Sequence, residues 1–159
     1  MPIVPPWLSI IFIAALPIIE LRGALPVAAL IYGMPWYEAV GLSILGNMLP
    51  VPFILWGMPL AEKVLRKIQV FDRFFNWLFA RTRRKAEDTI RIYGLIGLAI
   101  FVAIPLPATG AWTGSLVAYL FGFKKSQALL SIFAGVVAAG AIVAAICYLF
   151  KGFLWVVGV

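Results

Sequence analysis

The chain has 159 residues, of which 64% are hydrophobic and 12% are charged, and its mean hydropathy is +1.06. Soluble domains contain about 45–50% apolar and about 25% charged residues, so this composition excludes a soluble domain, a disordered chain and a nucleic-acid-binding domain. The single cysteine, Cys147, excludes a disulfide within the chain, and the lack of histidine excludes a histidine metal site or proton relay. The composition is that of an integral membrane protein with a single membrane domain.

The first apolar region, residues 7–33, is interrupted by Glu20-Leu21-Arg22-Gly23-Ala24-Leu25-Pro26. A helix that crosses a bilayer needs about 20 apolar residues, and the arms 7–19 and 24–33 are each about half a bilayer long. Backbone that is not helical is tolerated at membrane depth only inside protein or beside a wet cavity. We therefore expect a re-entrant helical hairpin with its break at Arg22-Gly23. The alternative is a spanning helix kinked at a proline.

Two charges in this break, Glu20 and Arg22, are the strongest functional signal in the sequence. A charge at bilayer depth costs at least about 2.5–3.5 kcal/mol, so an ionisable residue there indicates a functional site. A break at Gly23, with Pro26 close behind, frees the two side chains to pair or to face one cavity. Glu20 would then carry a proton or bind a cation, and Arg22 would hold an anionic headgroup. The alternative is a structural ion pair.

The second apolar segment, residues 36–61, is long enough to span a membrane and carries a single charge, Glu38, at its start. We predict a transmembrane helix here, which completes a first repeat over residues 1–61. Asn47 is its only amide side chain. It is a candidate substrate contact, with a hydrogen bond between helices as the alternative.

Residues 62–91 hold 13 of the 19 charged residues, nine of them positive, in a chain of net charge +7. Apolar and charged residues alternate here at helical spacing, which predicts an amphipathic segment on the cytoplasmic surface of the membrane. We expect anionic lipid headgroups to bind the basic cluster of Arg81, Arg83, Arg84 and Lys85. The alternative is a specific lipid-phosphate or protein site.

The third apolar region, residues 92–122, is uncharged but is broken by Pro105-Leu106-Pro107-Ala108-Thr109-Gly110. The arms 92–104 and 111–122 again have half the length of a membrane span, so we predict a second re-entrant hairpin. Unwound backbone and a following helix N-terminus can bind ions. The site candidates at this break are Pro105, Pro107, Thr109, Gly110 and Trp112.

The last apolar segment, residues 126–150, contains no charged residue, which predicts a second transmembrane helix. Its stretch 134–145 is rich in Ala and Gly, which suits close packing within the chain or in a homodimer. Gly33, Ala39 and Gly46 match Gly122, Ala128 and Gly135 at a constant offset of 89 residues. We therefore expect an inverted repeat, with the second copy over residues 92–159.

The two interrupting motifs, Glu20 to Pro26 and Pro105 to Gly114, resemble the signature motifs of the small multi-drug export protein family. That family is similar to the DedA superfamily of membrane proteins, also called SNARE-associated or VTT proteins. The resemblance covers essentially the whole chain. It implies two oppositely oriented re-entrant hairpins and a transporter whose relatives flip polyprenyl phosphates or scramble phospholipids. DedA proteins carry an arginine before the second motif, whereas Phe101 to Pro105 has none here, which weakens a lipid-phosphate substrate.

These observations predict an all-α integral membrane protein of the cell membrane that crosses it several times, with residues 62–91 in the cytoplasm. The expected function is DedA-like transport of an amphipathic small molecule or lipid headgroup, coupled to protons through Glu20 and Arg22. One alternative is a small multidrug or cation exporter that uses Glu20 as its proton and substrate carboxylate. The other is a membrane scaffold that transports nothing. No motif for an enzyme, a metal or another cofactor is present, and we expect lipids and an unidentified substrate as partners.

Overall fold

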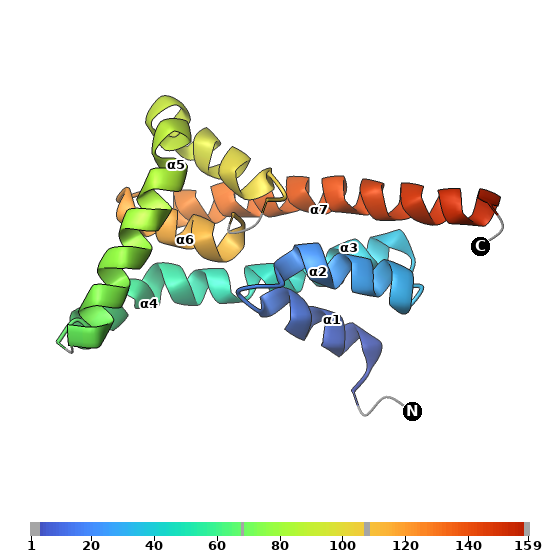
Figure 1. Ribbon diagram of the computed structural model, residues 1–159, viewed down its shortest axis with the longest axis horizontal. Coiled ribbons are helices and arrows are strands. Elements are labelled where there is room, and N and C mark those ends of the chain that lie inside the picture. Colours follow the sequence, from blue (N-terminus) through green and yellow to red (C-terminus); the bar gives the residue numbers. More distant parts are fainter. Residues whose placement is uncertain (1–3, 68, 107–108, 158–159) are drawn as a thin grey trace.

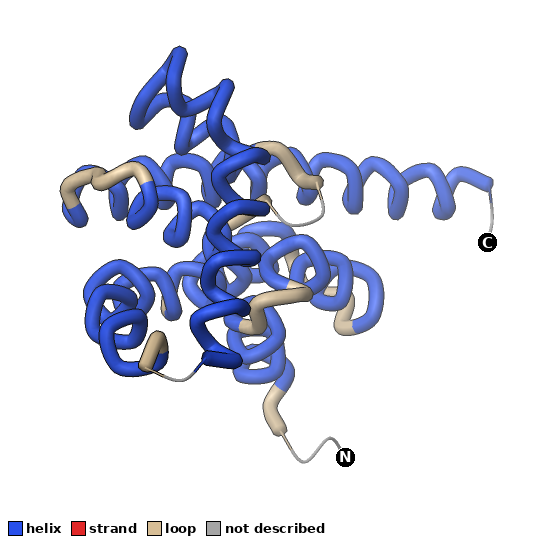
Figure 2. The backbone as a smooth tube through the Cα atoms, turned by 60° about the vertical axis from the view of Figure 1, so that its left-hand side comes forward, coloured by secondary structure: helices blue, strands red, loops and turns tan. Residues whose placement is uncertain are grey.

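The computed structural model describes residues 4–67, 69–106 and 109–157, and within them it contains helices and no strands (Figure 2). This confirms the all-helical prediction. Eight helical elements follow one another along the chain: α1 (Pro6–Ala15), α2 (Glu20–Pro26), the π-helix η1 (Val27–Ile31), α3 (Trp36–Met48), α4 (Pro50–Leu65), α5 (Gln69–Ala103), α6 (Ala111–Leu120) and α7 (Lys125–Val157).

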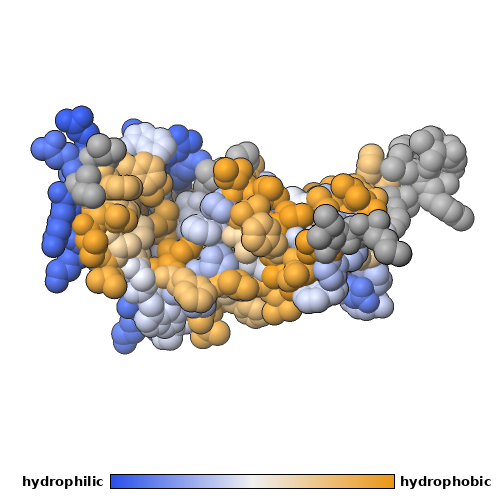
Figure 3. Space-filling model, turned by 90° about the horizontal axis from the view of Figure 1, so that it is seen from below, coloured by the Kyte–Doolittle hydropathy of each residue, from blue (hydrophilic) through white to orange (hydrophobic). Residues whose placement is uncertain are grey.

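Two rods of helix run along the long axis of the molecule, one formed by α3 and α4 and the other by α7 (Figure 1). Both contain a stretch that is long and apolar enough to cross a membrane, Trp36–Leu65 and Lys125–Phe150. The first half of α5 lies across one end of these rods (Figure 1). Hydrophilic side chains gather at that end, and hydrophobic ones cover much of the rest of the face seen in Figure 3.

The first rod is longer than the predicted helix 36–61 and is interrupted once. Pro50 has no amide hydrogen, so the hydrogen-bond ladder is broken there. The Leu49 N–H bonds to the carbonyls of both Leu45, at 3.1 Å, and Gly46, at 3.3 Å. Backbone angles stay helical through the interruption (Leu49 φ −57°, ψ −46°), so α3 and α4 form one rod. The rod ends at Leu65, and residues 62–65 therefore belong to it rather than to a separate surface segment.

The first pair of short helices, α1 with α2 and η1, turns back on itself over residues 16–19. The prediction placed this break at Arg22-Gly23 and was wrong, because residues 20–26 are helical. Pro17 ends α1 instead, since it cannot donate to the helical ladder. Gly23 allows the Ile19 side chain to pack closely over the helix. Pro26 lies inside α2, and directly after it the helix changes from α to π geometry in η1.

The second pair of short helices consists of the end of α5 and all of α6. Gly94 has left-handed backbone angles (φ 54°, ψ −124°), which bend α5 sharply. The arm that leads to the second break therefore starts after Gly94, a few residues later than the predicted Ile92. It ends at Ala103, and α6 begins at Ala111. Residues 69–93 form the amphipathic helix predicted for the basic segment.

α7 is the centre of the core and packs against α5, α2, α3 and α6. Two glycines on it allow close contact with neighbouring helices. Gly135 faces the Ala99 carbonyl and the Val102 side chain, and Gly140 faces the side chains of Ile44 and Leu21. This small-residue face therefore serves packing within the chain at these two positions.

Candidate functional site

The turns of the two short helix pairs meet near the middle of the molecule (Figure 1). Hydrogen bonds connect them directly. The indole Nε1–H of Trp112 donates to the Ala15 carbonyl at 3.1 Å, and the Trp112 backbone N–H donates to the Glu20 carboxylate at 3.2 Å. Residues more than 90 positions apart in the sequence are thus joined at one place.

Glu20 begins α2 and is 5% exposed. Its backbone has a positive φ of 52°, and it is the only described residue other than glycine with such an angle. Its carboxylate lies at the N-terminus of α6, where backbone N–H groups have no partner within the helix and favour negative charge. Glu20 therefore caps a helix of the other pair. Gly110 makes this approach possible, because a Cβ there would overlap the carboxylate.

Arg22 reaches across to the second turn rather than to Glu20. Its Nη2 donates to Thr109 Oγ1 at 2.9 Å and to the Ile104 carbonyl at 3.2 Å, and its Nη1 donates to the Leu106 carbonyl. The Thr109 hydroxyl also lies 2.8 Å from both of these carbonyls. Carbonyl and hydroxyl dipoles thus surround the guanidinium, and its buried Nε–H has no hydrogen-bond partner among the described residues.

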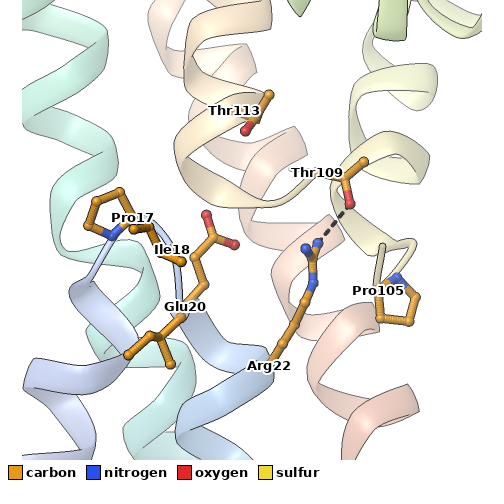
Figure 4. A pocket seen from close by; sticks show the side chains of 8 residues that line it. Pro17, Ile18, Glu20, Arg22, Pro105, Thr109 and Thr113 are labelled. Atoms are coloured by element: carbon orange, nitrogen blue, oxygen red, sulfur yellow. Dashed lines mark hydrogen bonds between the residues drawn. The ribbon is translucent and has the colours of Figure 1, made fainter. Parts of the chain in front are cut away.

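Glu20 and Arg22 form no ion pair in the described structure, where the salt bridges involve only Arg66. They line one cavity of about 440 Å³ instead, which was one of the two arrangements expected. Both side chains project into it, the carboxylate toward α6 and the guanidinium toward Thr109 (Figure 4). The walls of the cavity are Pro17, Ile18, Ile19, Glu20, Arg22, Pro105, Thr109 and Thr113.

The structure places the other predicted site residues in different positions. Pro105 and Thr109 line the cavity, and Gly110 and Trp112 contact Glu20. Pro107 lies outside the described residues.

Three other predicted site residues do not line the cavity. Gly23 and Pro26 lie in α2, after the two residues of that helix that line the cavity. Asn47 is 3% exposed inside α3, and within the described part of the chain its Oδ1 has no hydrogen-bond partner.

The sequence analysis missed Pro17, Ile18, Ile19 and Thr113 as wall residues. Pro17 carried a usable signal, because a proline cannot donate to the helical hydrogen-bond ladder and often marks the end of a helix. Thr113 carried a weaker signal: it is a polar residue in an apolar region, four positions after the site candidate Thr109.

The basic cluster of Arg81, Arg83, Arg84 and Lys85 is exposed on α5, away from the cavity. The guanidinium of Arg83 lies 5.8 Å from the ring centroid of Phe121, and that of Arg81 lies 5.4 Å from the ring of Trp77. The first contact places this part of α5 against the end of α6. The cluster therefore belongs to the surface at one end of the molecule.

A polar network at the same end joins α4, α5 and α6. Arg66 contacts Glu62 at 2.7 Å and Asp72 at 2.6 Å, and the Tyr119 hydroxyl donates to Glu62. Two hydrogen bonds raise the pKa of Arg66 above its ordinary value, and the one to Asp72 has a larger effect than the one to Glu62. No group of three His, Cys, Asp or Glu side chains within the described ranges has the arrangement of a metal site.

Two long apolar helices, packed against two pairs of short helices, define an all-helical membrane protein. Residues 20–142 match the model of the family described as "Putative small multi-drug export protein", and the chain belongs to this family. The match confirms the resemblance seen in the two interrupting motifs and indicates a membrane exporter. It begins at Glu20 and includes the second turn. No curated protein and no solved structure matches the chain.

Proposed function

We propose that this protein exports small amphipathic cations and that Glu20 is the carboxylate that binds them. The observation that carries the proposal is the position of Glu20, which is buried in a cavity between the two turns and forms no ion pair with any described residue. Burying an ionised carboxylate costs free energy unless a cation or a proton compensates its charge. Arg22 lines the same cavity, but its hydrogen bonds go to the second turn, so a cation or a proton at the Glu20 carboxylate would compensate the charge more directly.

The position of Arg22 argues against a lipid phosphate as the substrate. Its guanidinium donors are aimed at two backbone carbonyls and Thr109 in the second turn. A phosphate would have to displace these acceptors to gain the bidentate contact that makes arginine a strong phosphate ligand. Arg22 instead joins the two turns and keeps the cavity in shape.

In this proposal the two short helix pairs are re-entrant hairpins that enter the membrane from opposite sides, as an inverted repeat. Their length supports this, since ten residues of α1 or of α6 extend about 15 Å, half the hydrocarbon thickness. The meeting of their turns between the two ends of the rods supports it as well. The binding site then lies near the midplane of the cell membrane, with the basic part of α5 on the cytoplasmic surface.

Transport in this scheme is an exchange of a proton for the cation at Glu20. The cation leaves when the carboxylate is protonated from the outer side, and a new cation replaces the proton from the cytoplasm. Protonation also weakens the bond between Glu20 and the N-terminus of α6, because a neutral carboxyl group interacts less with the helix dipole. The same event therefore loosens one connection between the turns. The proposal requires no cofactor and no catalysed chemical reaction.

The substitution Glu20→Gln tests this proposal, because it keeps the size of the side chain and removes its charge. We expect the variant to fold. Its uptake of radiolabelled hexyltrimethylammonium into proteoliposomes, driven by a pH gradient, should be at least about tenfold slower than that of the wild type. Glu38→Gln is the matched control, since Glu38 is an exposed carboxylate at the start of α3. A Glu20→Gln protein as active as the wild type would refute the mechanism, and a wild type without transport would favour the scaffold.

A further inference from the structure

An apolar groove of about 700 Å³ lies beside the cavity, bounded by α4, α5 and α6. Its volume is within the range of pockets that hold small molecules, about 300–1,000 Å³. The described residues that line it are all apolar, aromatic or glycine, among them Phe53, Ile54, Met58, Phe74, Phe75 and Leu116.

The groove and the cavity share a wall. Pro17 lines both of them. Trp112 lines the groove, while its backbone N–H bonds to the Glu20 carboxylate and its indole bonds to the Ala15 carbonyl. The groove and the cavity therefore adjoin at Pro17, and the apolar surface on the side of α4 lies next to the space in front of Glu20.

We infer that the groove binds the apolar part of the same cation whose charged group binds at Glu20. This inference rests on the proposed function and adds to it the binding site of the apolar group, which selects cations with an extended apolar chain. The apolar lining favours such a group, because removing each methylene from water strengthens binding about fourfold. The other possible occupant, an acyl chain of a bulk lipid, would give the groove no role in choosing the substrate.

Gly57 offers a way to fill the groove without disturbing the protein. It is exposed and lines the groove, and a Cβ added to it would meet no other atom within 4 Å. Because Gly57 is part of the groove wall, we expect a leucine there to narrow the groove. Gly41 is the matched control, since it is also a helical glycine with no atom within 4 Å of an added Cβ, and it lies on α3 away from the groove.

The test compares the binding of hexyltrimethylammonium and tetramethylammonium, which share a charged group, to the full-length protein in lipid nanodiscs. Empty nanodiscs correct for partition into lipid. In the wild type and in Gly41→Leu we expect the hexyl compound to bind at least about tenfold more tightly. In Gly57→Leu we expect this ratio to fall to about threefold or less, with tetramethylammonium unaffected.

Gly57→Ala adds one carbon to the groove and should give an intermediate ratio, which keeps the test valid if the leucine variant does not fold. An unchanged ratio in the folded Gly57 variants would overturn the inference and assign the groove to bulk lipid. The proposed function would survive that result, because it predicts a different one: Glu20→Gln should lose the binding of both cations. If neither cation bound to the wild type, the proposed function and the inference would both fail.

Discussion

Glu20 adopts backbone angles that residues with side chains rarely take. A left-handed conformation of this kind costs about 1–3 kcal/mol and persists only where the surroundings hold it. Here the surroundings are the turn at Pro17 and the N-terminus of α6, to which the carboxylate bonds. The strain coincides with the residue proposed to bind the substrate, as is common at functional sites.

The contact between Gly110 and Glu20 makes a prediction about stability. Gly110→Ala should lower the free energy of unfolding by about 1–3 kcal/mol for the backbone angle alone, since φ is +132° there. It should lower it further because the new Cβ overlaps the carboxylate. Thermal unfolding in detergent, followed by tryptophan fluorescence, measures the change.

Gly122→Ala separates these two effects. Gly122 also has a positive φ, +68°, but a Cβ added there would meet no atom within 4 Å. We expect this variant to lose only the contribution of the backbone and to bind cations normally. Equal losses of stability in the two variants would show that the carboxylate does not pack against Gly110.

The elements differ in how far the sequence alone defines them. The rods α3–α4 and α7 were predictable because twenty or more apolar residues in a row meet the length requirement of a bilayer. The position of the first turn was not, because charges next to a glycine in an apolar run predict an irregular backbone, whereas Glu20 and Arg22 lie in a helix. Buried charges can lie inside a helix when a neighbouring element supplies their partners, and here that element is the second turn.

The basic face of α5 makes a prediction at this scale. Each basic residue near an anionic membrane contributes about 1 kcal/mol of attraction. Changing Arg81, Arg83, Arg84 and Lys85 to Gln should therefore weaken the dependence of the unfolding temperature on the fraction of phosphatidylglycerol in nanodiscs. The variant in which the three arginines become Lys keeps the charge and is the control. If both variants behaved alike, the cluster would have to act through the geometry of arginine, as in a specific site.

The whole molecule has two ends, each marked by a contact between distant parts of the chain. At one end Arg83 lies against Phe121. At the other, the Tyr148 hydroxyl donates to the Met34 carbonyl at 2.8 Å. The basic part of α5 and the start of α7 therefore lie at the same end, whereas four simple spans would separate them across the membrane.

Cysteine labelling tests this arrangement in cells that express the protein with Cys147→Ala. Cysteines introduced at the exposed positions Arg84 and Lys124 should react from the same side of the membrane, and one at Glu38 should react from the opposite side. Membrane-impermeant maleimides, applied to intact cells and to inverted vesicles, give the measurement. Labelling of positions 84 and 124 from opposite sides would contradict two re-entrant hairpins and favour four spanning helices.

The sequence by itself determined that this is a helical membrane protein, where its two long apolar helices lie, and that each of the two other apolar regions is broken. Hydropathy decides these features, because they depend on a run of neighbouring residues compared with the thickness of a bilayer. It also pointed to Glu20 and Arg22, since charges are rare in such runs.

Only the tertiary structure decided what these two residues do for the fold. Glu20 caps a helix that begins 91 positions later, at Ala111, and Arg22 bonds to the second turn instead of to Glu20. The turn at residues 16–19 and the shared wall at Trp112 likewise follow from the meeting of the two helix pairs. Partners so far apart in the chain are chosen by packing and by the need to satisfy buried polar groups, which no local pattern of residues records.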